Sequence, residues 1–283
     1  MASLHEIERY YDGVPRSIAR AEEIGPFTLF VNTRSGWPYY ARPSLGAQSF
    51  RVEDILRVRA RQRQLQVPES FEWVAETTPA LAAVAEAAGL SVGRHPLMVL
   101  DHDRTLESPQ SPQSPQSPPR MVEGDQGLES PPGVEARLVT PSDDLAMFSA
   151  IGQIAFTHAG TEVGPQGVED ARSVVRHDPG EVALRQERLR QGLTVMVEGC
   201  IDGEPVGVGG HNPLNGITEI VGVGVLPAFR RRGIAAALTR ALVDDARRRN
   251  IGTVFLSAGD DNVARLYARI GFRTVATACL AEP

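Results

Sequence analysis

The residues best suited to chemistry lie in the stretch EIVGVGVLPAFRRRGIA, which runs from Glu219 to Ala235. Its valines alternate with isoleucine and glycine, which predicts a β-strand that ends before Pro227. Three arginines follow, and Gly233 then opens the helix-forming run IAAALTRALVDDARRRN. The first turn of a helix leaves backbone N–H groups without partners, and the helix dipole favours an anion there. The stretch therefore predicts a phosphate site at a strand-to-helix junction.

Two glycines in this strand narrow the kind of phosphate site. A dinucleotide-binding turn is excluded, because Pro227 stands where the third glycine of a G-x-G-x-x-G turn would be. Gly222 and Gly224 instead clear one face of the strand of side chains, which suits the close approach of another backbone or of a slim ligand arm. Packing of a helix against that face is an equally good interpretation.

A second motif with chemical potential begins at Asn262. The pattern NVARLYARIGF predicts a helix with Val263, Leu266 and Tyr267 on one face, and Gly271 is placed to end it. A tyrosine on such a face is more often part of a core than a catalyst. Tyr267 is nevertheless the only tyrosine in the second half of the sequence, so its role is open to a direct test.

In this order and spacing the two motifs resemble the GNAT superfamily of acyl-coenzyme-A-dependent N-acyltransferases. They read Val225-x-Pro227-x-x-Arg230-x-x-Gly233-Ile-Ala235-x-x-Leu238 and Leu266-Tyr267-x-x-x-Gly271-Phe272. The resemblance covers roughly residues 134–283. It implies a central sheet that is splayed between its fourth and fifth strands, with the pantetheine arm of acetyl-CoA in the gap and no metal.

The resemblance also implies roles for individual residues. Backbone groups of the strand would pair with pantetheine, the amides from Arg231 to Ala236 would hold the diphosphate, and Tyr267 would protonate the departing thiolate. Arg231 departs from the family pattern, in which glycine is frequent, and Asn262 lies closer to Tyr267 than is usual. The predicted cofactor-binding residues are Val223, Gly224, Val225, Arg230, Arg231, Arg232, Gly233, Ile234, Ala235, Ala236, Asn262 and Tyr267.

Transfer to an amine also needs a base, because an ammonium ion has no lone pair with which to attack. Glu219 is the first candidate, since a carboxylate at the start of this strand resembles the base position of some GNAT members. A chain of water molecules is the alternative, with Glu219 as a solvated strand end. His158, His177 and His211 are further candidates on predicted loops. The expected mechanism is direct attack within a ternary complex, with a strand amide stabilising the oxyanion.

Composition limits the classes of protein to which the chain can belong. Its 283 residues suffice for two domains, its net charge of -6 argues against binding nucleic acid by bulk attraction, and its two cysteines give no disulfide framework. The sequence contains no lysine, which excludes a P-loop and Schiff-base chemistry. No apolar stretch is long enough to span a membrane, and we expect a cytoplasmic protein.

The segment SPQSPQSPQSPP divides the chain, because proline at every third position without apolar residues cannot build a core. We therefore predict a domain at 1–104, a flexible linker at 105–133 and a catalytic domain at 134–283. Aligning Gly89 with Gly271 superimposes helix, strand, helix and strand in the two halves, which indicates a degenerate GNAT-like copy. Ala85 then stands where Tyr267 is, so the copy has no cofactor site.

The predicted fold is a mixed α/β sheet, with a GNAT fold in the second half. In the first half we expect a helix over residues 1–25, strands at 26–31, 70–74 and 95–100, and helices at 52–65 and 80–88. The first half is expected to pack on the second, with Trp37, Tyr39 and Tyr40 walling the acceptor cleft.

The predicted activity is transfer of an acetyl group to the primary amine of a small molecule, with no nucleic-acid or membrane partner. The sequence leaves two alternative functions open. One is acetylation of a protein lysine or N-terminus, and the other is a non-catalytic acyl-CoA sensor or scaffold.

Overall fold

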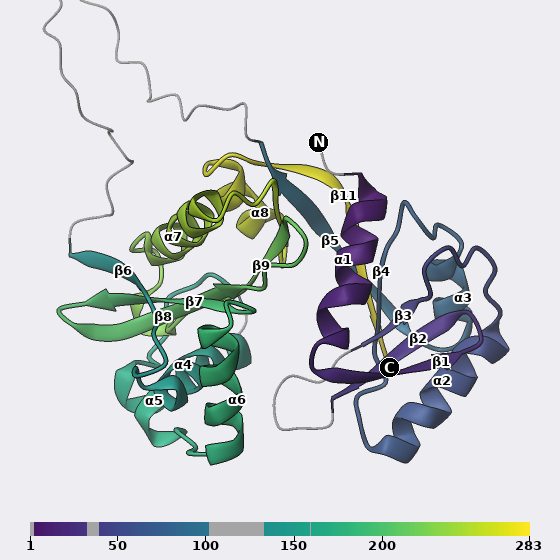
Figure 1. Ribbon diagram of the computed structural model, residues 1–283, viewed down its shortest axis with the longest axis horizontal. Helices are drawn as coiled ribbons and strands as arrows, with labels where there is room; N and C mark the ends of the chain where they lie inside the picture. Colours follow the sequence, from purple (N-terminus) through teal and green to yellow (C-terminus); the bar gives the residue numbers. More distant parts are fainter. Residues whose placement is uncertain (1–2, 33–39, 102–132, 159) are drawn as a thin grey trace, which may run out of the picture.

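The computed structural model describes residues 3–32, 40–101, 133–158 and 160–283. Within them, eleven strands form one sheet in the order β1-β2-β3-β4-β11-β5-β10-β9-β8-β7-β6, and both halves of the chain contribute to it (Figure 1). The first half supplies β1 (Ala19–Ile24), β2 (Phe27–Asn32), β3 (Ala41–Pro43), β4 (Phe71–Val74) and β5 (Ser91–Leu100). The second half supplies β6 (Val134–Leu138), β7 (Val195–Ile201), β8 (Glu204–His211), β9 (Ile217–Val225), β10 (Thr253–Ser257) and β11 (Phe272–Glu282).

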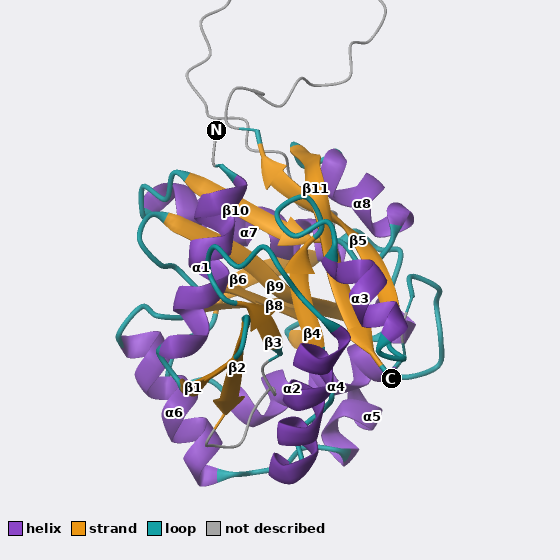
Figure 2. Ribbon diagram, turned by 90° about the vertical axis from the view of Figure 1, so that its right-hand side faces the viewer, coloured by secondary structure: helices purple, strands orange, loops and turns teal. Residues whose placement is uncertain are grey.

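Helices pack against both faces of this sheet, as the view of Figure 2 shows. The first half contains α1 (Leu4–Arg16), α2 (Val52–Leu65) and α3 (Leu81–Ala87). The second half contains α4 (Leu145–Thr157), α5 (Val168–Ser173), α6 (Pro179–Arg190), α7 (Ile234–Arg248) and α8 (Asp261–Ala268), with a short 3-10 helix at Pro227–Phe229. The predicted mixed α/β architecture is confirmed. None of the helices in the described residues is both long and apolar enough to cross a membrane.

Most elements form where the sequence predicts them, and β1 is the main exception. The predicted helix over residues 1–25 ends at Arg16, and residues 19–24 form a strand instead. The segment ARAEEI has no apolar period of its own, so it is stabilised by antiparallel pairing with β2 along its whole length. Glu22 on this edge strand also forms an ion pair with Arg61 of α2 at 2.8 Å. Tertiary contacts thus decide the structure of this segment.

Each half donates one strand to the other half. β5 from the first half lies between β10 and β11 of the second half and is antiparallel to both. Conversely β11, the last strand of the chain, lies between β5 and β4 of the first half. The long β5–β11 pair therefore joins the halves through backbone hydrogen bonds as well as side-chain packing.

The β5–β11 pair also relates the two halves by approximate twofold symmetry. Gly89 and Gly271 each follow a helix with a positive φ, of 82° and 108°, and each precedes one of the exchanged strands. Aligning these glycines superimposes β5 on β11. The symmetry operation then converts the pair Ser91↔Glu282 into the pair Leu100↔Phe272, with a difference of one residue. The register shift between Thr274 and Ala276 of β11 accounts for that residue. The internal repeat expected from the sequence is therefore visible in the strand order.

The three largest apolar clusters among the described residues fill most of the space around the sheet. One lies within the second half and contains Leu238 of α7 and Tyr267 of α8 together with Met98 and Leu100 of β5. A second lies within the first half, around Trp73. The third lies where the halves meet, and there α1 covers the face of β5 and β10 that is turned away from α7. Helix α1 belongs to the first half in sequence but packs on strands of the second.

The predicted linker, residues 105–133, lies outside the described residues except for Gly133. Trp37 and Tyr39, two of the three aromatic residues expected to wall the acceptor cleft, also lie outside them. The division into domains at 1–104 and 134–283 stays a proposal.

Candidate active site

The sheet opens between β9 and β10. These parallel strands pair only from Thr253↔Ile217 to Phe255↔Glu219, whereas β9 continues to Val225. At Gly222, where φ is +65°, the register of β9 against β8 shifts by one residue. This bulge bends β9 away from β10. The backbone of β9 beyond Glu219 therefore has no β10 partner.

The direction of the backbone groups in this opening follows from one hydrogen bond. The amide of Leu226 donates to the carbonyl of Val206, toward β8. Because N–H and C=O groups alternate between the two sides of a strand, those of Val225 and Val223 point the other way, toward the opening. The carbonyl of Val225 accepts a hydrogen bond from Arg230 Nε at 3.2 Å.

Different structural features require the two glycines of β9. A Cβ on Gly224 would lie 2.9 Å from the Cβ of Ala155, so the close packing of α4 requires this glycine. A Cβ on Gly222 would meet nothing within 4 Å, and there the positive φ is what favours glycine. The packing of α4 therefore accounts for Gly224, as one of the two interpretations expected.

Unpartnered amides surround the start of α7. Gly233 precedes the helix with φ +80°, and the first intrahelical bond runs from the amide of Ala237 to the carbonyl of Gly233. No acceptor among the described residues binds the amides from Arg231 to Ala236. Such a run of free N–H groups at a helix N-terminus is suited to an anion. The position of α7 directly after β9 places this anion site beside the opening.

Arg230 makes structural hydrogen bonds in addition to carrying charge. Its guanidinium donates to the carbonyls of Ala155 at 3.0 Å, His158 at 2.5 Å and Glu162 at 3.2 Å. These bonds hold the C-terminal end of α4 and the segment after it against the end of β9. Burial lowers the pKa of Arg230. The arginine is therefore a clamp between α4 and β9.

The next two arginines are exposed and differ in backbone conformation. Arg231 has φ +65°, a left-handed conformation that glycine adopts without strain. The guanidinium of Arg232 lies 5.3 Å from the ring centroid of Phe229. Neither guanidinium forms an ion pair with the described residues.

Helix α8 carries the two residues of the second motif. Tyr267 is 7% exposed, and its ring packs against Phe272 with the centroids 6.0 Å apart. Burial raises the pKa of Tyr267 to about 12. Its hydroxyl has no hydrogen-bond partner among the described residues and stays protonated at neutral pH. Asn262 is exposed in the first turn of α8, whose N-terminus Asp260 caps through the amides of Asn262 and Val263.

Glu219 lies where β9 and β10 part, and residues of the first half surround it. Its Oε1 accepts a hydrogen bond from the Tyr11 hydroxyl at 3.0 Å, and its amide donates to the Tyr10 hydroxyl at 3.0 Å. Burial and the nearby carboxylate of Glu72 raise the pKa of Glu219 to about 8, against the opposing effects of Arg42 and Tyr11. A carboxylate with this pKa is suited to accept a proton near neutral pH.

The three histidines proposed as alternative bases are separated by the structure. His211 is fully buried between Thr218 and Asp245, with ring-nitrogen distances of 2.8 Å and 3.0 Å, and burial lowers its pKa. His177 is exposed, and His158 Nδ1 lies 3.0 Å from the carbonyl of Ile154. His211 therefore has a structural role in joining β8, β9 and α7.

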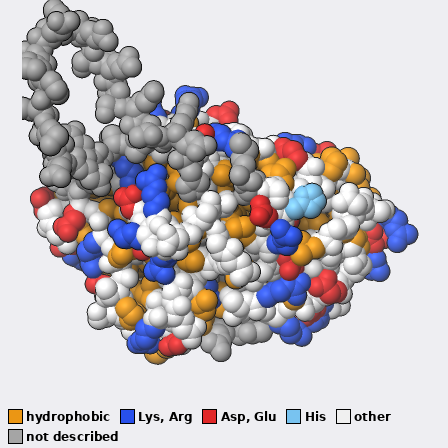
Figure 3. Space-filling model, turned by 45° about the horizontal axis from the view of Figure 1, so that its top comes forward, with side chains coloured by type: hydrophobic (Ala, Val, Ile, Leu, Met, Phe, Trp, Pro, Cys, Tyr) orange, Lys and Arg blue, Asp and Glu red, His pale blue; other side chains and the backbone are white. Residues whose placement is uncertain are grey.

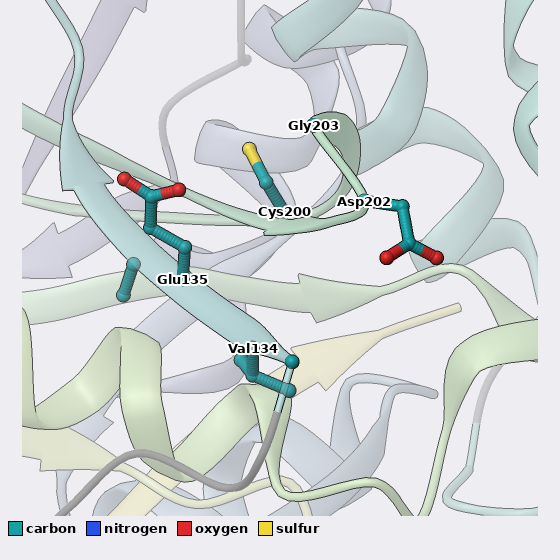
Figure 4. Close-up of a pocket in the computed structure, with 7 residues that line it drawn as sticks. Val134, Glu135, Cys200, Asp202 and Gly203 are labelled. Atoms are coloured by element: carbon teal, nitrogen blue, oxygen red, sulfur yellow. The ribbon is translucent and has the colours of Figure 1, made fainter.

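One pocket lies at the β6 edge of the sheet, away from the opening between β9 and β10. It has a volume of about 520 Å³ and is lined by β6, by Cys200 at the end of β7 and by the Asp202–Gly203 turn (Figure 4). None of the predicted site residues lines it. Burial raises the pKa of Cys200, which keeps the thiol protonated.

Positive and negative side chains are interspersed over the face of the molecule shown in Figure 3, without a patch of one sign. Among the described residues no group of three or more His, Cys, Asp or Glu side chains is arranged to hold a metal ion.

Comparison with known proteins identifies most of the second half. A family model described as the acetyltransferase (GNAT) family matches residues 167–272, from α5 to the start of β11. These residues are a GNAT acetyltransferase domain. The GNAT family uses acetyl-CoA as its donor, so the chain carries an acetyltransferase domain whose acceptor is not determined. No curated protein is significantly similar to the chain in sequence.

Solved structures are similar to the whole chain. A GCN5-related N-acetyltransferase from Kribbella flavida is 22% identical, with a TM-score of 0.67, and the match covers 100% of this chain and 96% of that one. A GCN5-related N-acetyltransferase from Sphaerobacter thermophilus is 20% identical, with a TM-score of 0.57 and coverage of 100% and 85%. A tandem GNAT protein from the clavulanic acid biosynthesis pathway is 15% identical, with a TM-score of 0.50 and coverage of 91% and 78%. At these identities the matches show the fold alone, and they extend over both halves of the chain.

The structure brings together some residues that the sequence could not connect. Tyr11, Arg42 and Glu72 lie around Glu219, although each is more than 140 residues away from it in the chain. No spacing or motif in the first half marks them. Only the exchange of strands between the halves places α1 over the second half's sheet.

Proposed function

We propose that the chain transfers an acetyl group from acetyl-CoA to the primary amine of a small molecule, by direct attack of the amine while both substrates are bound. One observation carries the proposal: β9 and β10 part at Glu219, so a carboxylate with a pKa of about 8 lies where the opening for the donor begins. The alternative of a sensor without catalysis gives no reason for such a carboxylate at this point.

The residues around the opening fit acetyl-CoA. The free amides from Arg231 to Ala236 would bind its diphosphate, and the backbone groups of Val223 and Val225 would pair with the pantetheine arm. Asn262, exposed at the start of α8, would bind near the thioester. The donor supplies an acyl group activated as a thioester, and the chain holds it beside Glu219.

Proton transfer at two side chains completes the reaction. Glu219 takes a proton from the acceptor's ammonium group, and the free nitrogen lone pair then attacks the carbonyl carbon of the thioester. As the N–C bond forms and the C–S bond breaks, the Tyr267 hydroxyl gives its proton to the sulfur. The second proton that the nitrogen loses restores the Tyr267 hydroxyl, and the proton on Glu219 leaves to solvent. The products are an N-acetylated amine and free coenzyme A. Glu219 must be ionised and Tyr267 protonated, and with pKa values of about 8 and about 12 both conditions hold between these two pH values.

The surroundings of Glu219 favour a small acceptor. Glu219 is half-buried beneath α1 and receives a hydrogen bond from Tyr11 of that helix. Because α1 covers Glu219, the amine of a small molecule reaches it more easily than an amine on the surface of a folded protein does.

Release of coenzyme A thiol in the presence of a panel of small primary amines tests the proposed function. We expect amine-dependent release with a matching mass increase of the amine by one acetyl group. Acetylation of lysine peptides without turnover of any small amine would favour the protein acceptor. Tight binding of acetyl-CoA without any turnover would favour the sensor.

The anion site at α7 can be tested by Ala235→Glu. A carboxylate in the first helical turn is favourable for the helix itself, but it repels a diphosphate bound to the same amides. We expect the Kd for acetyl-CoA to rise at least about tenfold by calorimetry. Because Ala235 is partly buried against the core, the melting temperature of the free protein is measured alongside. The matched control is Ala60→Glu on the exposed face of α2, which should leave the Kd unchanged. Equal affinity in both variants would place the diphosphate elsewhere.

The role of Tyr267 can be tested by Tyr267→Phe, which removes only the hydroxyl. The expected loss in kcat is about tenfold, because a thiol of ordinary pKa leaves moderately well without an acid. Steady-state kinetics should show an unchanged KM for acetyl-CoA. A wild-type kcat would assign Tyr267 to the core alone.

A further inference from the structure

A chain of polar contacts links Glu219 to three elements of the first half. The Tyr11 hydroxyl of α1 donates to Glu219 Oε1 at 3.0 Å. The guanidinium of Arg42, on β3, lies 3.9 Å from the centroid of the Tyr11 ring. Arg42 also forms an ion pair with Glu72 on β4. The contacts thus run from β4 through β3 and α1 to the point where β9 and β10 part.

This arrangement places two carboxylates and one guanidinium in a largely enclosed space. The side chains of Arg42 and Glu72 are only 11% and 30% exposed. Charged groups removed from water are costly unless they are paired, and Arg42 is the cation that pairs with Glu72. The second carboxylate, Glu219, is held by a neutral hydroxyl instead.

We propose that Tyr11, Arg42 and Glu72 are positioning residues for Glu219, so that the first half completes the active site of the second half. The inference rests on the proposed role of Glu219 as the base. It also assigns a function to the first half, which supplies the environment of the base while the second half supplies the donor site.

Each of the three residues has a distinct effect on Glu219. Tyr11 occupies one carboxylate oxygen and so leaves the other oxygen for the acceptor's proton. Burial holds the pKa of Tyr11 well above its usual range, so this hydroxyl remains a donor. Arg42 stabilises ionised Glu219 through its positive charge, whereas Glu72 opposes ionisation.

Other titratable or charged groups lie around this chain of contacts. Glu8 on α1 acts on Arg42, and His95 on β5 and Glu282 on β11 act on Glu72. Tyr10 on α1 accepts a hydrogen bond from the Glu219 amide, and Arg188 on α6 acts on Tyr10.

The decisive experiment is a titration of the Glu219 carboxyl carbon by NMR in full-length protein labelled at glutamate Cδ, with Glu219→Gln to assign the signal. Loss of the hydrogen bond in Tyr11→Phe and loss of the cation in Arg42→Gln should both raise the Glu219 pKa. Loss of the like charge in Glu72→Gln should lower it. We expect each shift to be at least about 0.5 pH unit.

Two control variants match these changes. Tyr10→Phe alters the same helix, but the Tyr10 hydroxyl accepts a hydrogen bond from the Glu219 amide and forms none with the carboxyl, so the pKa of the carboxyl should stay in place. Glu86→Gln removes an exposed carboxylate of the first half that lies near Arg94, and it should also leave the titration unchanged. If Arg42→Gln does not fold, the opposite shifts of Tyr11→Phe and Glu72→Gln still decide the matter.

Shifts of the same sign in Tyr11→Phe and Glu72→Gln, or no shift in either, would overturn the proposal. The titration needs no acceptor, so it is independent of whether an amine is found. With an acceptor in hand, the acid limb of kcat/KM should move in the same directions as the NMR titration. Full activity of Glu219→Gln would overturn the proposed role of Glu219 as the base. If Glu219→Gln is inactive but the variants of Tyr11, Arg42 and Glu72 leave the acid limb of kcat/KM unshifted, only the positioning role of these three residues is overturned.

Discussion

We expect the fragment 134–283 to show no acetyl transfer by itself and to regain activity when residues 1–104 are supplied as a second chain. Without β5, strands β10 and β11 lose the partner that lies between them. The core around Tyr267 also loses Met98 and Leu100, which are 2% and 3% exposed. Burying each such side chain stabilises a fold by about 1.5–3 kcal/mol, so the isolated fragment should be poorly folded. Co-expression followed by an assay of thiol release measures the recovery.

The matched control cuts the full chain within residues 105–132, where the structure describes no element. A protease site introduced there and then cleaved should leave the activity within about twofold, because the β5–β11 pairing is intact in the nicked protein. Should the fragment 134–283 retain more than a tenth of the full-length activity, the exchanged strand is dispensable and Glu219 functions without the first half.

The exchange of strands also explains which parts of this fold the sequence could predict. Helix α2 forms at residues 52–65, where the sequence predicts a helix. The Asp202–Gly203 hairpin turn, with φ of +52° and +80°, is likewise formed by a dipeptide typical of tight turns. A strand period or a turn dipeptide is a local property, so it survives any change in how the halves are assembled. Which strands pair with β5 depends on how the whole chain assembles, and no local pattern in the sequence predicts it.

The same distinction separates the two sides of the candidate site. The donor side is continuous in sequence, from Val223 through Gly233 to Ala236, so a motif could reveal it. The surroundings of Glu219 come from α1, β3 and β4, which reach it only through assembly of the two halves. Tyr10 and Tyr11 are aromatic residues on a helix face, a pattern typical of a core. Nothing in that pattern predicts their hydrogen bonds to the amide and the carboxylate of Glu219.

The second large effect is expected from Glu219→Gln. Glutamine keeps the shape of the side chain and can still accept a hydrogen bond from Tyr11, but it cannot take a proton from the acceptor. General base catalysis contributes about 10²- to 10⁴-fold, so kcat/KM for the amine should fall by about a thousandfold. The KM for acetyl-CoA should stay near that of the wild type. A fall of less than about threefold would favour the chain of water molecules.

The pH dependence provides an independent check of the same residue. In the free enzyme Glu219 is protonated below its pKa of about 8 and is then unable to act as a base. The wild-type kcat/KM should therefore rise about tenfold per pH unit below pH 8 and level off above it. Tyr267 stays protonated throughout this range, because its pKa is about 12. Measuring kcat/KM with two acceptors whose amines differ in pKa distinguishes ionisation of the enzyme from ionisation of the substrate. The midpoint of the pH dependence should remain near pH 8 with both acceptors. In Glu219→Gln this pH dependence should be absent. A midpoint that follows the amine instead would show that Glu219 is not the group that titrates.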